Sequence, residues 1–456
     1  MILTTLIATH FVIQSGQSSH EPLGAPLPRR GAIGLGFAPL PPAEAQKLKL
    51  KAGTGLIISR VVPGFTGDLA GVRAGDIILN INGKALGVPE IAEFARNLPT
   101  GKEVNFRVVR DGKEVDLKTV HKEKERDLGT ADYEVIYSHI VSYGKRMRTI
   151  ITKPRKAGKH PGFFFIQGFS PISYDYVLDR PQYDITRIDA PMLADIAKSG
   201  YVTMRVEKPG VGDSEGGPFA DLDYNTEIDI YRQALKQLKA QPEVDNDNVF
   251  ICGHSMGGAF GPMIACEIPV KGISVYGTAA RTWLEYLLDT VRYQGLLSGE
   301  SFEQADESVR LASRMMAMII LENMTPAEVK KKHPELAKEV DGMFPGGLFN
   351  GKTTKFWAQL GQINFPAYWA KCNARVLSVR GESDYVTYDA DHKLIADVVN
   401  RVHPGWARFE IAKSSDHLFN DWPTEADSMK NWTKGNFNMN FTNMTKAWMK
   451  EVMAQR

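Results

Sequence analysis

The stretch from Val249 to Gly258 constrains the fold of this chain more than any other. A short apolar run leads into Gly-X-Ser-X-Gly, centred on Ser255, and small residues follow. A run of that kind predicts a buried strand, and the residues after it predict a helix. Glycines at 253 and 257 allow a sharp turn between the two, which holds the Ser255 hydroxyl clear of the backbone. We therefore expect an exposed serine nucleophile at the edge of a sheet.

The helix after this turn is expected to supply part of an anion site. Its free N–H groups point back at Ser255, so the N–H of Met256 is predicted to stabilise an oxyanion that forms on an attacked carbonyl. The same five-residue motif also occurs in ordinary loops, so the motif alone leaves a catalytic and an incidental interpretation open. The strand before it and the small residues after it favour the catalytic one.

Length and charge limit the classes of protein. The 456 residues suffice for two or three domains, and a net charge of +2 without a dense basic cluster argues against nucleic acid as the main partner. Cys252, Cys266 and Cys372 have neither metal-site nor disulfide spacing, and we interpret all three as small buried or neutral residues. Beyond the N-terminal segment, no apolar run reaches the roughly 20 residues of a membrane span.

Residues 1–30 are interpreted as a signal or an N-terminal extension. Met1 to Val12 is mostly apolar and runs into a small polar stretch, which is typical of a secretory signal. A positively charged start and an Ala-X-Ala cleavage site are missing. Export to the periplasm or the exterior and a cytoplasmic location therefore stay open as alternatives.

Residues 31–120 combine several strand-like runs with one helical stretch, Val88 to Leu98. Four motifs occur here in order: Gly34-Leu35-Gly36-Phe37, Val61-Val62-Pro63-Gly64, Ala70-Gly71-Val72-Arg73-Ala74-Gly75-Asp76-Ile77-Ile78 and Asn80-Ile81-Asn82-Gly83-Lys84. With them the region resembles a PDZ domain of the bacterial protease-associated type. The resemblance implies a small, mostly-β domain.

The same resemblance implies a peptide site. In that family the Gly-Leu-Gly-Phe segment captures the terminal carboxylate of a peptide through backbone N–H groups, and the peptide adds a strand to the sheet edge. Leu35, Gly36 and Phe37 are therefore candidate binding positions, with Ile91 and Phe94 lining an apolar pocket. A purely structural or dimerising role is the alternative, because a fold alone does not give function.

Residues 121–133 are charged and poor in large apolar side chains, which predicts a linker. Two strand-like runs joined by a hairpin-sized turn follow, and then Gly162 to Ser170, an apolar run that passes through a glycine. Together with the turn at Ser255, the order of these pieces resembles an α/β-hydrolase over residues 134–456. The resemblance implies the α/β-hydrolase fold.

Strand-like alternation disappears between about 281 and 370, where helical stretches take over, including Trp283 to Tyr293, Glu303 to Glu322 and Thr325 to Val340. A helical insert between two strands of a sheet is typical of a lid that excludes water and sets substrate size. Packing within the lid and lining of an acyl pocket are alternatives for its large side chains, Met315, Met316, Met318, Phe344, Phe349, Trp357 and Trp369.

Two late loops hold the expected partners of Ser255. The family places its triad acid in a turn after a late strand, which here reads Gly381-Glu382-Ser383-Asp384-Tyr385-Val386, so the resemblance implies Asp384 as the acid. His417 follows the last predicted strand and is the candidate base. The order serine, aspartate, histidine matches the family. The neighbouring Asp391 is interpreted as a solvated charge at the start of a helix.

A second oxyanion donor is expected on the loop after the strand that begins near Gly162. The family often has His-Gly there, whereas this chain has Gln167 before the glycine. We assign the donor to the N–H of Phe169, because the amide just after the glycine usually points inward in that family. The glycine-rich loop with Glu207 and Asp213 is interpreted as the floor of the site.

The complete set predicts a serine hydrolase in which His417 activates Ser255 and Asp384 fixes the tautomer of His417. No metal or organic cofactor is implied. The first hypothesis is a carboxylesterase acting on a modest acyl ester, and the alternative is an aminopeptidase-like or oligopeptidase-like serine peptidase whose PDZ domain binds peptide C-termini. A non-catalytic peptide-binding scaffold is a third. The expected partners are a small ester or peptide, and the oligomeric state stays open.

Overall fold

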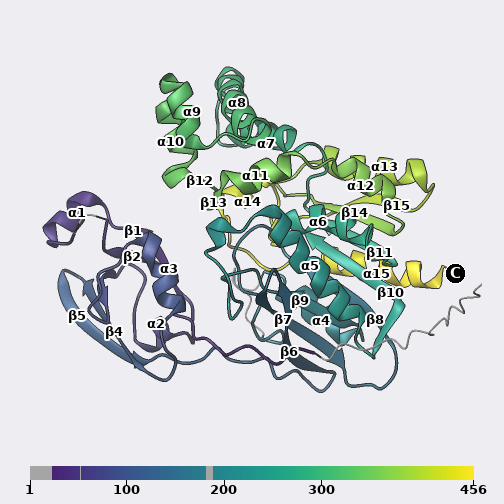
Figure 1. The fold of residues 1–456 in the computed structure, drawn as a ribbon, viewed down its shortest axis with the longest axis horizontal. Coiled ribbons are helices and arrows are strands. Elements are labelled where there is room, and N and C mark those ends of the chain that lie inside the picture. Colours follow the sequence, from purple (N-terminus) through teal and green to yellow (C-terminus); the bar gives the residue numbers. More distant parts are fainter. Residues whose placement is uncertain (1–22, 52, 181–187, 456) are drawn as a thin grey trace, which may run out of the picture.

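The computed structural model describes residues 23–51, 53–180 and 188–455. The signal-like residues up to 22 lie outside this part of the chain. Two bodies follow each other in sequence, and Figure 1 shows the smaller, N-terminal one in purple and blue beside the larger one. Each body is organised around its own β-sheet.

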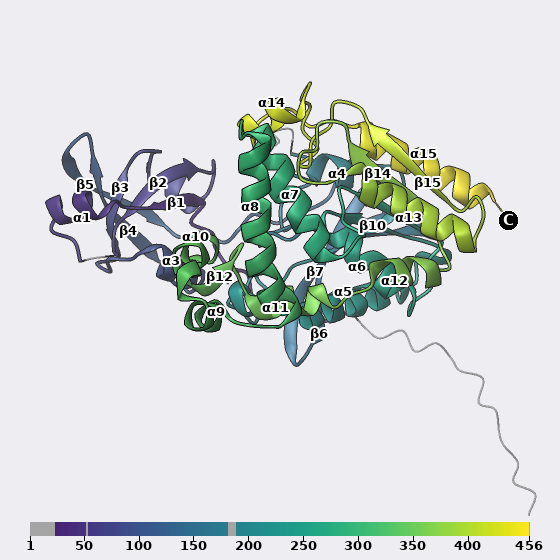
Figure 2. The same ribbon diagram turned by 90° about the horizontal axis from the view of Figure 1, so that it is seen from above.

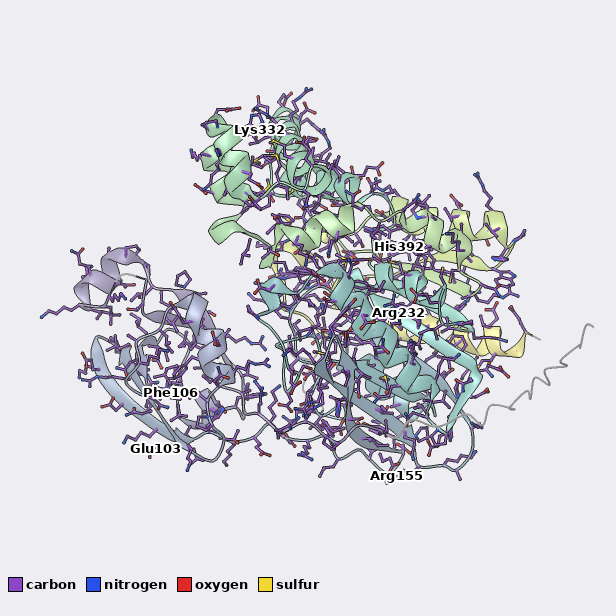
Figure 3. All side chains as sticks on the ribbon, in the orientation of Figure 1. Glu103, Phe106, Arg155, Arg232, Lys332 and His392 are labelled. Atoms are coloured by element: carbon purple, nitrogen blue, oxygen red, sulfur yellow. The ribbon has the colours of Figure 1, made fainter. Side chains whose placement is uncertain are left out.

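The smaller body is built on a five-stranded antiparallel sheet with the order β1-β2-β3-β4-β5. Its elements are β1 (Leu35–Pro39), α1 (Pro42–Lys47), β2 (Leu56–Val61), α2 (Thr66–Leu69), β3 (Ile77–Ile81), α3 (Val88–Arg96), β4 (Glu103–Arg110) and β5 (Lys113–Val120). The helix predicted from Val88 is confirmed as α3, whereas the short α1 was not predicted. Phe106 of β4 points into the core and is 0% exposed, while Glu103 points outward (Figure 3).

The larger body contains an eight-stranded sheet with the order β6-β7-β9-β8-β10-β11-β14-β15. The strands are β6 (Tyr133–Ser142), β7 (Lys145–Pro154), β8 (His160–Ile166), β9 (Val202–Val206), β10 (Val244–His254), β11 (Gly272–Tyr276), β14 (Arg375–Gly381) and β15 (Ala407–Ala412). Strand β7 runs antiparallel to both of its neighbours, and the strands from β9 to β15 are parallel. This order, in which the third and fourth strands exchange places, confirms the predicted α/β-hydrolase fold.

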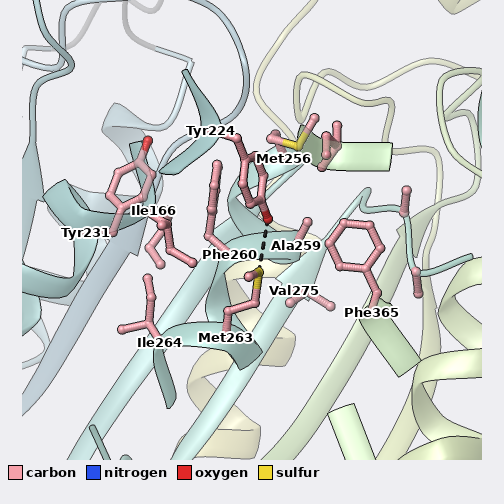
Figure 4. Packing of buried hydrophobic residues seen from close by; sticks show 14 of the residues in the cluster. Ile166, Tyr224, Tyr231, Met256, Ala259, Phe260, Met263, Ile264, Val275 and Phe365 are labelled. Carbon is pink, nitrogen blue, oxygen red and sulfur yellow. Dashed lines mark hydrogen bonds between the residues drawn. The ribbon is translucent and has the colours of Figure 1, made fainter. Parts of the chain in front are cut away.

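Helices cover both faces of the large sheet. They are α4 (Ala190–Lys198), α5 (Tyr224–Lys239), α6 (Met256–Ala265), α12 (Phe365–Lys371), α13 (Asp389–Val402) and α15 (Asn440–Ala454), and the short α14 (Glu425–Lys430) lies in the segment between β15 and α15. Strand β8 shows why two layers are needed: Phe163 and Phe165 join the core with α4 and α15, whereas Phe164 and Ile166 join the core with α5 and α6. Figure 4 shows the core on the side of α5 and α6, in which the Tyr224 hydroxyl contacts the sulfur of Met263 at 3.0 Å.

The three cysteines differ in exposure. Cys252, within β10, and Cys372, just after α12, are buried as predicted. Cys266 is not buried, because this residue caps the C-terminus of α6 and is exposed there. All three are free thiols.

A mostly helical insert separates β11 from β14. Its elements are α7 (Trp283–Leu297), α8 (Phe302–Met316), a π-helical turn (Ala317–Leu321), α9 (Pro326–Lys332), α10 (Ala337–Met343), β12 (Leu348–Phe349), β13 (Lys352–Thr353) and α11 (Thr354–Gly361). Helices α7 and α8 lie side by side (Figure 2). The single helix predicted from Thr325 to Val340 is wrong, because Pro334 forces His333 out of the helical region and divides α9 from α10. Among the helices described, none has the length and apolar character needed to cross a bilayer.

The chain enters and leaves the smaller body through two adjacent segments. Gly31 and Glu123 form an antiparallel bridge, and the N–H of Lys124 donates to the carbonyl of Arg30 at 3.0 Å. Just before this bridge, the incoming segment lies on the larger body, since the Arg148 guanidinium donates to the carbonyl of Leu27 at 3.0 Å. The outgoing segment falls within the range predicted as a linker.

Arg29 anchors this junction in a buried cluster of charges. Its guanidinium pairs with Asp175 and, at 3.2 Å, with Asp213. Arg148 also pairs with Asp213, at 2.6 Å. The four side chains are at most 1% exposed. Because a charge without water needs its partner, each of them depends on the others.

Replacing Arg29 by methionine should destabilise the larger body by about 3–5 kcal/mol, because it leaves buried carboxylates short of a counter-charge. Urea unfolding followed by tryptophan fluorescence measures this loss, since every tryptophan of the chain lies beyond residue 280. Arg408→Met is the matched control in the same body, because that arginine is 41% exposed and pairs with Glu451 at the surface, at 2.9 Å. Its expected cost is about 0–1 kcal/mol, and equal costs for both variants would contradict the prediction.

Candidate active site

Ser255 lies where β10 ends and α6 begins, with a φ of 54° that serine rarely adopts. Close packing requires the glycines on either side. A Cβ at position 253 would lie 2.6 Å from the carbonyl oxygen of Gly257, and a Cβ at position 257 would lie 2.0 Å from that of Ile166. The Gly-X-Ser-X-Gly motif therefore follows from how tightly β8, β10 and α6 meet.

The structure brings the three predicted triad side chains together. His417 Nε2 lies 3.0 Å from Ser255 Oγ, and His417 Nδ1 lies 2.9 Å from Asp384 Oδ2. Ser255, Asp384 and His417 follow β10, β14 and β15, respectively. Because these strands are parallel, the loops at their carboxyl ends meet at one edge of the sheet.

Asp384 is held as a carboxylate. Its Oδ1 accepts the N–H groups of Val386 at 2.8 Å and Thr387 at 3.1 Å, and its Oδ2 accepts the Thr387 hydroxyl at 2.7 Å. Burial alone would raise the pKa of Asp384, but the charge and hydrogen bond of His417 outweigh burial and hold this pKa well below its usual value. An ionised Asp384 accepts the Nδ1 proton of His417, which leaves Nε2 free to accept the Ser255 hydroxyl.

His417 itself is 5% exposed. Burial opposes its protonation, but the nearby charge of Asp384 and their hydrogen bond outweigh burial and raise the pKa of His417 above its ordinary value. The imidazole is therefore a stronger base than a free histidine.

Two neighbours that sequence reasoning missed hold the His417 loop. His254 Nε2 donates to the carbonyl of His417 at 2.8 Å, and burial, aided by the charge of His417, lowers the pKa of His254 to about 3. Asp416 accepts the N–H groups of Leu418 at 2.8 Å and Asn420 at 2.7 Å. Their positions directly beside Ser255 and His417 in the sequence were the available signal.

Other polar residues near the motifs have structural partners. The interpretation of Asp391 as a solvated charge is wrong: it is 0% exposed and accepts the N–H groups of Ala280 and Arg281, both at 2.9 Å. Asp391 thus fixes the start of the insert. Asp213 belongs to the Arg29 cluster.

The loop after β8 passes directly over the nucleophile. A Cβ at Gly168 would lie 3.1 Å from the Cβ of Ser255, so a side chain there would press against the nucleophile. Phe169 and Met256 line the same cavity as Ser255, as their predicted oxyanion roles require. Gln167 turns away, since its Nε2 donates to the carbonyl of Val206 at 2.8 Å.

A cavity of about 390 Å³ opens beside Ser255. The insert supplies much of its wall through Trp283, Tyr286, Leu287, Met316, Phe349 and Trp357. Of the large side chains considered for this role, four do not line this cavity: Met315, Met318, Phe344 and Trp369. Within the described chain, every residue that lines the cavity is uncharged. No cluster of three or more His, Cys, Asp or Glu suited to a metal ion occurs among the described residues.

The predicted peptide site falls on β1, the outer strand of the small sheet. Leu35 and Phe37 are half buried against the core, as is Phe94 of α3, while Ile91 is 4% exposed. Gly36 lies at an irregularity where the pairing with β2 shifts. One edge of β1 pairs with β2, and the sheet ends at the other.

Comparisons with known proteins cover the two bodies unequally. Residues 57–110 match the family model for a PDZ domain, which confirms the predicted PDZ domain. The magnetosome formation protease MamE of Magnetospirillum gryphiswaldense is 31% identical over 83 residues, 18% of this chain and 11% of that protein. The polyketide transferase ATR5 of Stachybotrys chlorohalonatus is 27% identical over 111 residues, 24% of this chain and 36% of that protein. The matches thus span well under half the length of these curated relatives.

Solved structures resemble the chain over a longer stretch. A highly thermostable carboxyl esterase from Bacillus coagulans aligns with 70% of this chain and 99% of its own, at 14% sequence identity and a TM-score of 0.44.

The pKa values of the two neighbouring histidines should be shifted in opposite directions from the ordinary histidine value. In NMR spectra of the histidine-labelled protein, His417 should lose its proton above pH 6.5, while His254 stays neutral from about pH 5 to 9 because its pKa is near 3. Asp384→Asn should lower the pKa of His417 below 6.5, since burial then acts without the carboxylate. Asp389→Asn is the control: it removes a half-exposed carboxylate nearby and should leave the pKa of His417 unchanged. If Asp384→Asn also leaves the pKa of His417 unchanged, the prediction is contradicted.

Proposed function

We propose that this chain, which joins a PDZ domain to an α/β-hydrolase fold, is a serine hydrolase that cleaves carboxylic esters with an apolar acyl group. The observation that carries the proposal is the hydrogen-bonded series Ser255–His417–Asp384 at the mouth of an uncharged cavity.

In the proposed reaction, Ser255 Oγ attacks the ester carbonyl while His417 Nε2 takes its proton. Asp384 holds the imidazole in the required tautomer and stabilises the imidazolium that forms. The N–H groups of Met256 and Phe169 hold the oxyanion. His417 then gives its proton to the departing alcohol, which leaves an acyl group on Ser255. A water molecule, activated by His417, releases the acid and restores the serine.

The cavity favours an ester over an aminoacyl amide. An aminopeptidase must hold the protonated amine of its substrate, and a carboxylate is the usual partner for it. The described wall of this cavity has no acidic side chain, and moving a charge into such surroundings without a partner is costly. Trp283, Trp357 and Met316 instead offer apolar contact. A neutral, apolar acyl group is therefore the better occupant.

A fluorophosphonate should label the wild-type protein, and Ser255→Ala should abolish both labelling and ester hydrolysis. Ser298→Ala, at an exposed position after α7, is the control and should keep both activities. For esters of straight-chain acids, kcat/KM should rise about fourfold per added methylene until the cavity is full, because each buried CH₂ contributes about 0.8 kcal/mol.

Acyl groups of matched length but ending in a carboxylate should be hydrolysed at least about 100-fold more slowly, because their charge loses its water. Equal rates for charged and neutral acyl groups would contradict the apolar-acyl proposal. Aminoacyl amides hydrolysed faster than every ester would favour the peptidase alternative instead.

The PDZ match and the outer position of β1 support a second function, binding of a peptide C-terminus beside Leu35, Gly36 and Phe37. An added peptide strand would pair with the outer edge of β1, and the N–H groups near Gly36 would hold its carboxylate. Peptide capture of this kind also suits the serine peptidase alternative, because it would bring peptide substrates to the larger body.

Calorimetric titration with a peptide library should show that peptides with a free C-terminal carboxylate bind at least about tenfold more tightly than the same peptides amidated, because charge-assisted hydrogen bonds to the carboxylate are lost on amidation. The amidated peptides are the matched control. Equal affinity for the two forms would rule out carboxylate capture and favour a structural role for the PDZ domain.

A further inference from the structure

The loop over Ser255 is tethered by one buried lysine. Lys208, on the loop after β9, places its Nζ 2.6 Å from the carbonyl oxygen of Gly168 and 2.8 Å from that of Phe169. The Lys208 side chain is 1% exposed. Lys208 therefore holds the carbonyls of both Gly168 and Phe169. The same segment carries the Phe169 N–H, which is the expected second oxyanion donor.

Because the peptide bond is planar, the contact between Lys208 and the Gly168 carbonyl also fixes the direction of the Phe169 N–H. The Gly168 carbonyl and the Phe169 N–H belong to one planar trans peptide, in which the two groups point in opposite directions. With the carbonyl directed at Lys208, the N–H points away from the lysine. Gly168 lies against Ser255, and Phe169 shares its cavity. A flip of this one peptide would replace the donor with a carbonyl oxygen, which repels an oxyanion.

Lys208 is itself held by a buried carboxylate. Glu227 of α5 receives Lys208 on Oε1 and Lys352 on Oε2, each at 2.8 Å, and all three side chains are at most 1% exposed. Burial would raise the pKa of Glu227, but the two lysine charges outweigh burial and hold this pKa below its usual range. Burial also lowers the pKa of Lys208 and lowers that of Lys352 to about 8, so at neutral pH an ionised Glu227 links two cations in a site closed to water.

The second cation connects this network to the insert. Lys352 lies on β13, and its Nζ sits 3.8 Å from the centre of the Phe356 ring on α11. The ring of Phe169 packs at 5.1 Å against Trp357 and at 5.8 Å against Phe356, measured between ring centres. The insert therefore contacts the loop over Ser255 twice, through aromatic rings and through the chain of charges.

We propose that Lys208, held by Glu227 and Lys352, is a positioning residue that turns the Gly168–Phe169 peptide toward the oxyanion and couples the seating of the insert to the assembly of the oxyanion hole. The proposal rests on the proposed ester hydrolysis. Lys208 touches no reacting atom and acts through the orientation of Phe169. Lys352 acts one step further away, through the position of Glu227 and Lys208.

The test compares Lys208→Met, Lys208→Gln and Lys352→Met with wild type on a neutral aryl ester. Loss of one oxyanion donor typically lowers turnover about 100- to 1,000-fold, so Lys208→Met should lower kcat by about 10- to 1,000-fold while KM changes by less than about threefold. Lys208→Gln should recover part of kcat, because its amide can still donate to the Gly168 carbonyl. Lys352→Met should lower kcat less than Lys208→Met does.

Lys355→Met is the matched control. Lys355 lies three residues after Lys352 and pairs with Asp223 at 2.6 Å, but its side chain is 64% exposed. Its loss should leave kcat and KM unchanged. Tryptophan fluorescence and the melting temperature report whether each variant is folded. If Lys208→Met does not fold, Lys352→Met carries the test, and wild-type kcat in that folded variant overturns the proposal.

A folded Lys208→Met protein with wild-type kcat overturns the positioning role, as does a rise in KM that accounts for the whole loss of kcat/KM. Equal kcat for Lys208→Met and Lys208→Gln also overturns it, because the effect would then not depend on donation to the carbonyl. Wild-type protein that neither reacts with a fluorophosphonate nor hydrolyses any ester refutes the proposed function itself, whereas an active wild type with an unaffected Lys208→Met refutes only this inference.

Discussion

The contact between Gly257 of α6 and the end of β8 sets the geometry of the site. No side chain fits between position 257 and the carbonyl of Ile166, so the helix and the strand meet backbone to backbone. This contact fixes the strained Ser255 between them and also fixes where β8 releases its loop. Gly168 then passes over the serine at contact distance. The nucleophile and the loop that faces it are therefore placed by one packing constraint.

Much of this arrangement was accessible from the sequence, because its signals are local. Ser255, Asp384 and His417 each lie within a few residues of the end of an apolar run, and parallel strands bring such positions to one edge of a sheet. The glycines around Ser255 had a steric reason that the structure makes explicit. Pro334, which divides two helices of the insert, was also a local signal, although the prediction of one continuous helix passed over it.

The remaining features depend on contacts between residues far apart in the sequence, which no local sequence pattern predicts. Lys352 and Glu227 are 125 residues apart, and Asp391 meets Ala280 and Arg281 across the whole insert. A charged residue in a sequence is expected at the surface, and only the fold shows which charges are enclosed with a partner. The same holds for the cavity wall: Met315 and Met316 are both buried, but only Met316 of the two lines the cavity.

The paired segments at Gly31 and Glu123 give the PDZ domain an attachment unlike that of a module at the end of a chain. Two connections leave it at the same place, and Arg29 secures one of them inside the larger body. A domain held this way is restrained by two chain segments, unlike a domain that is attached through a single linker. A single proteolytic cut between residues 121 and 133 would break the covalent connection and leave the contacts of the N-terminal segment, including those of Arg29, to hold the two bodies together.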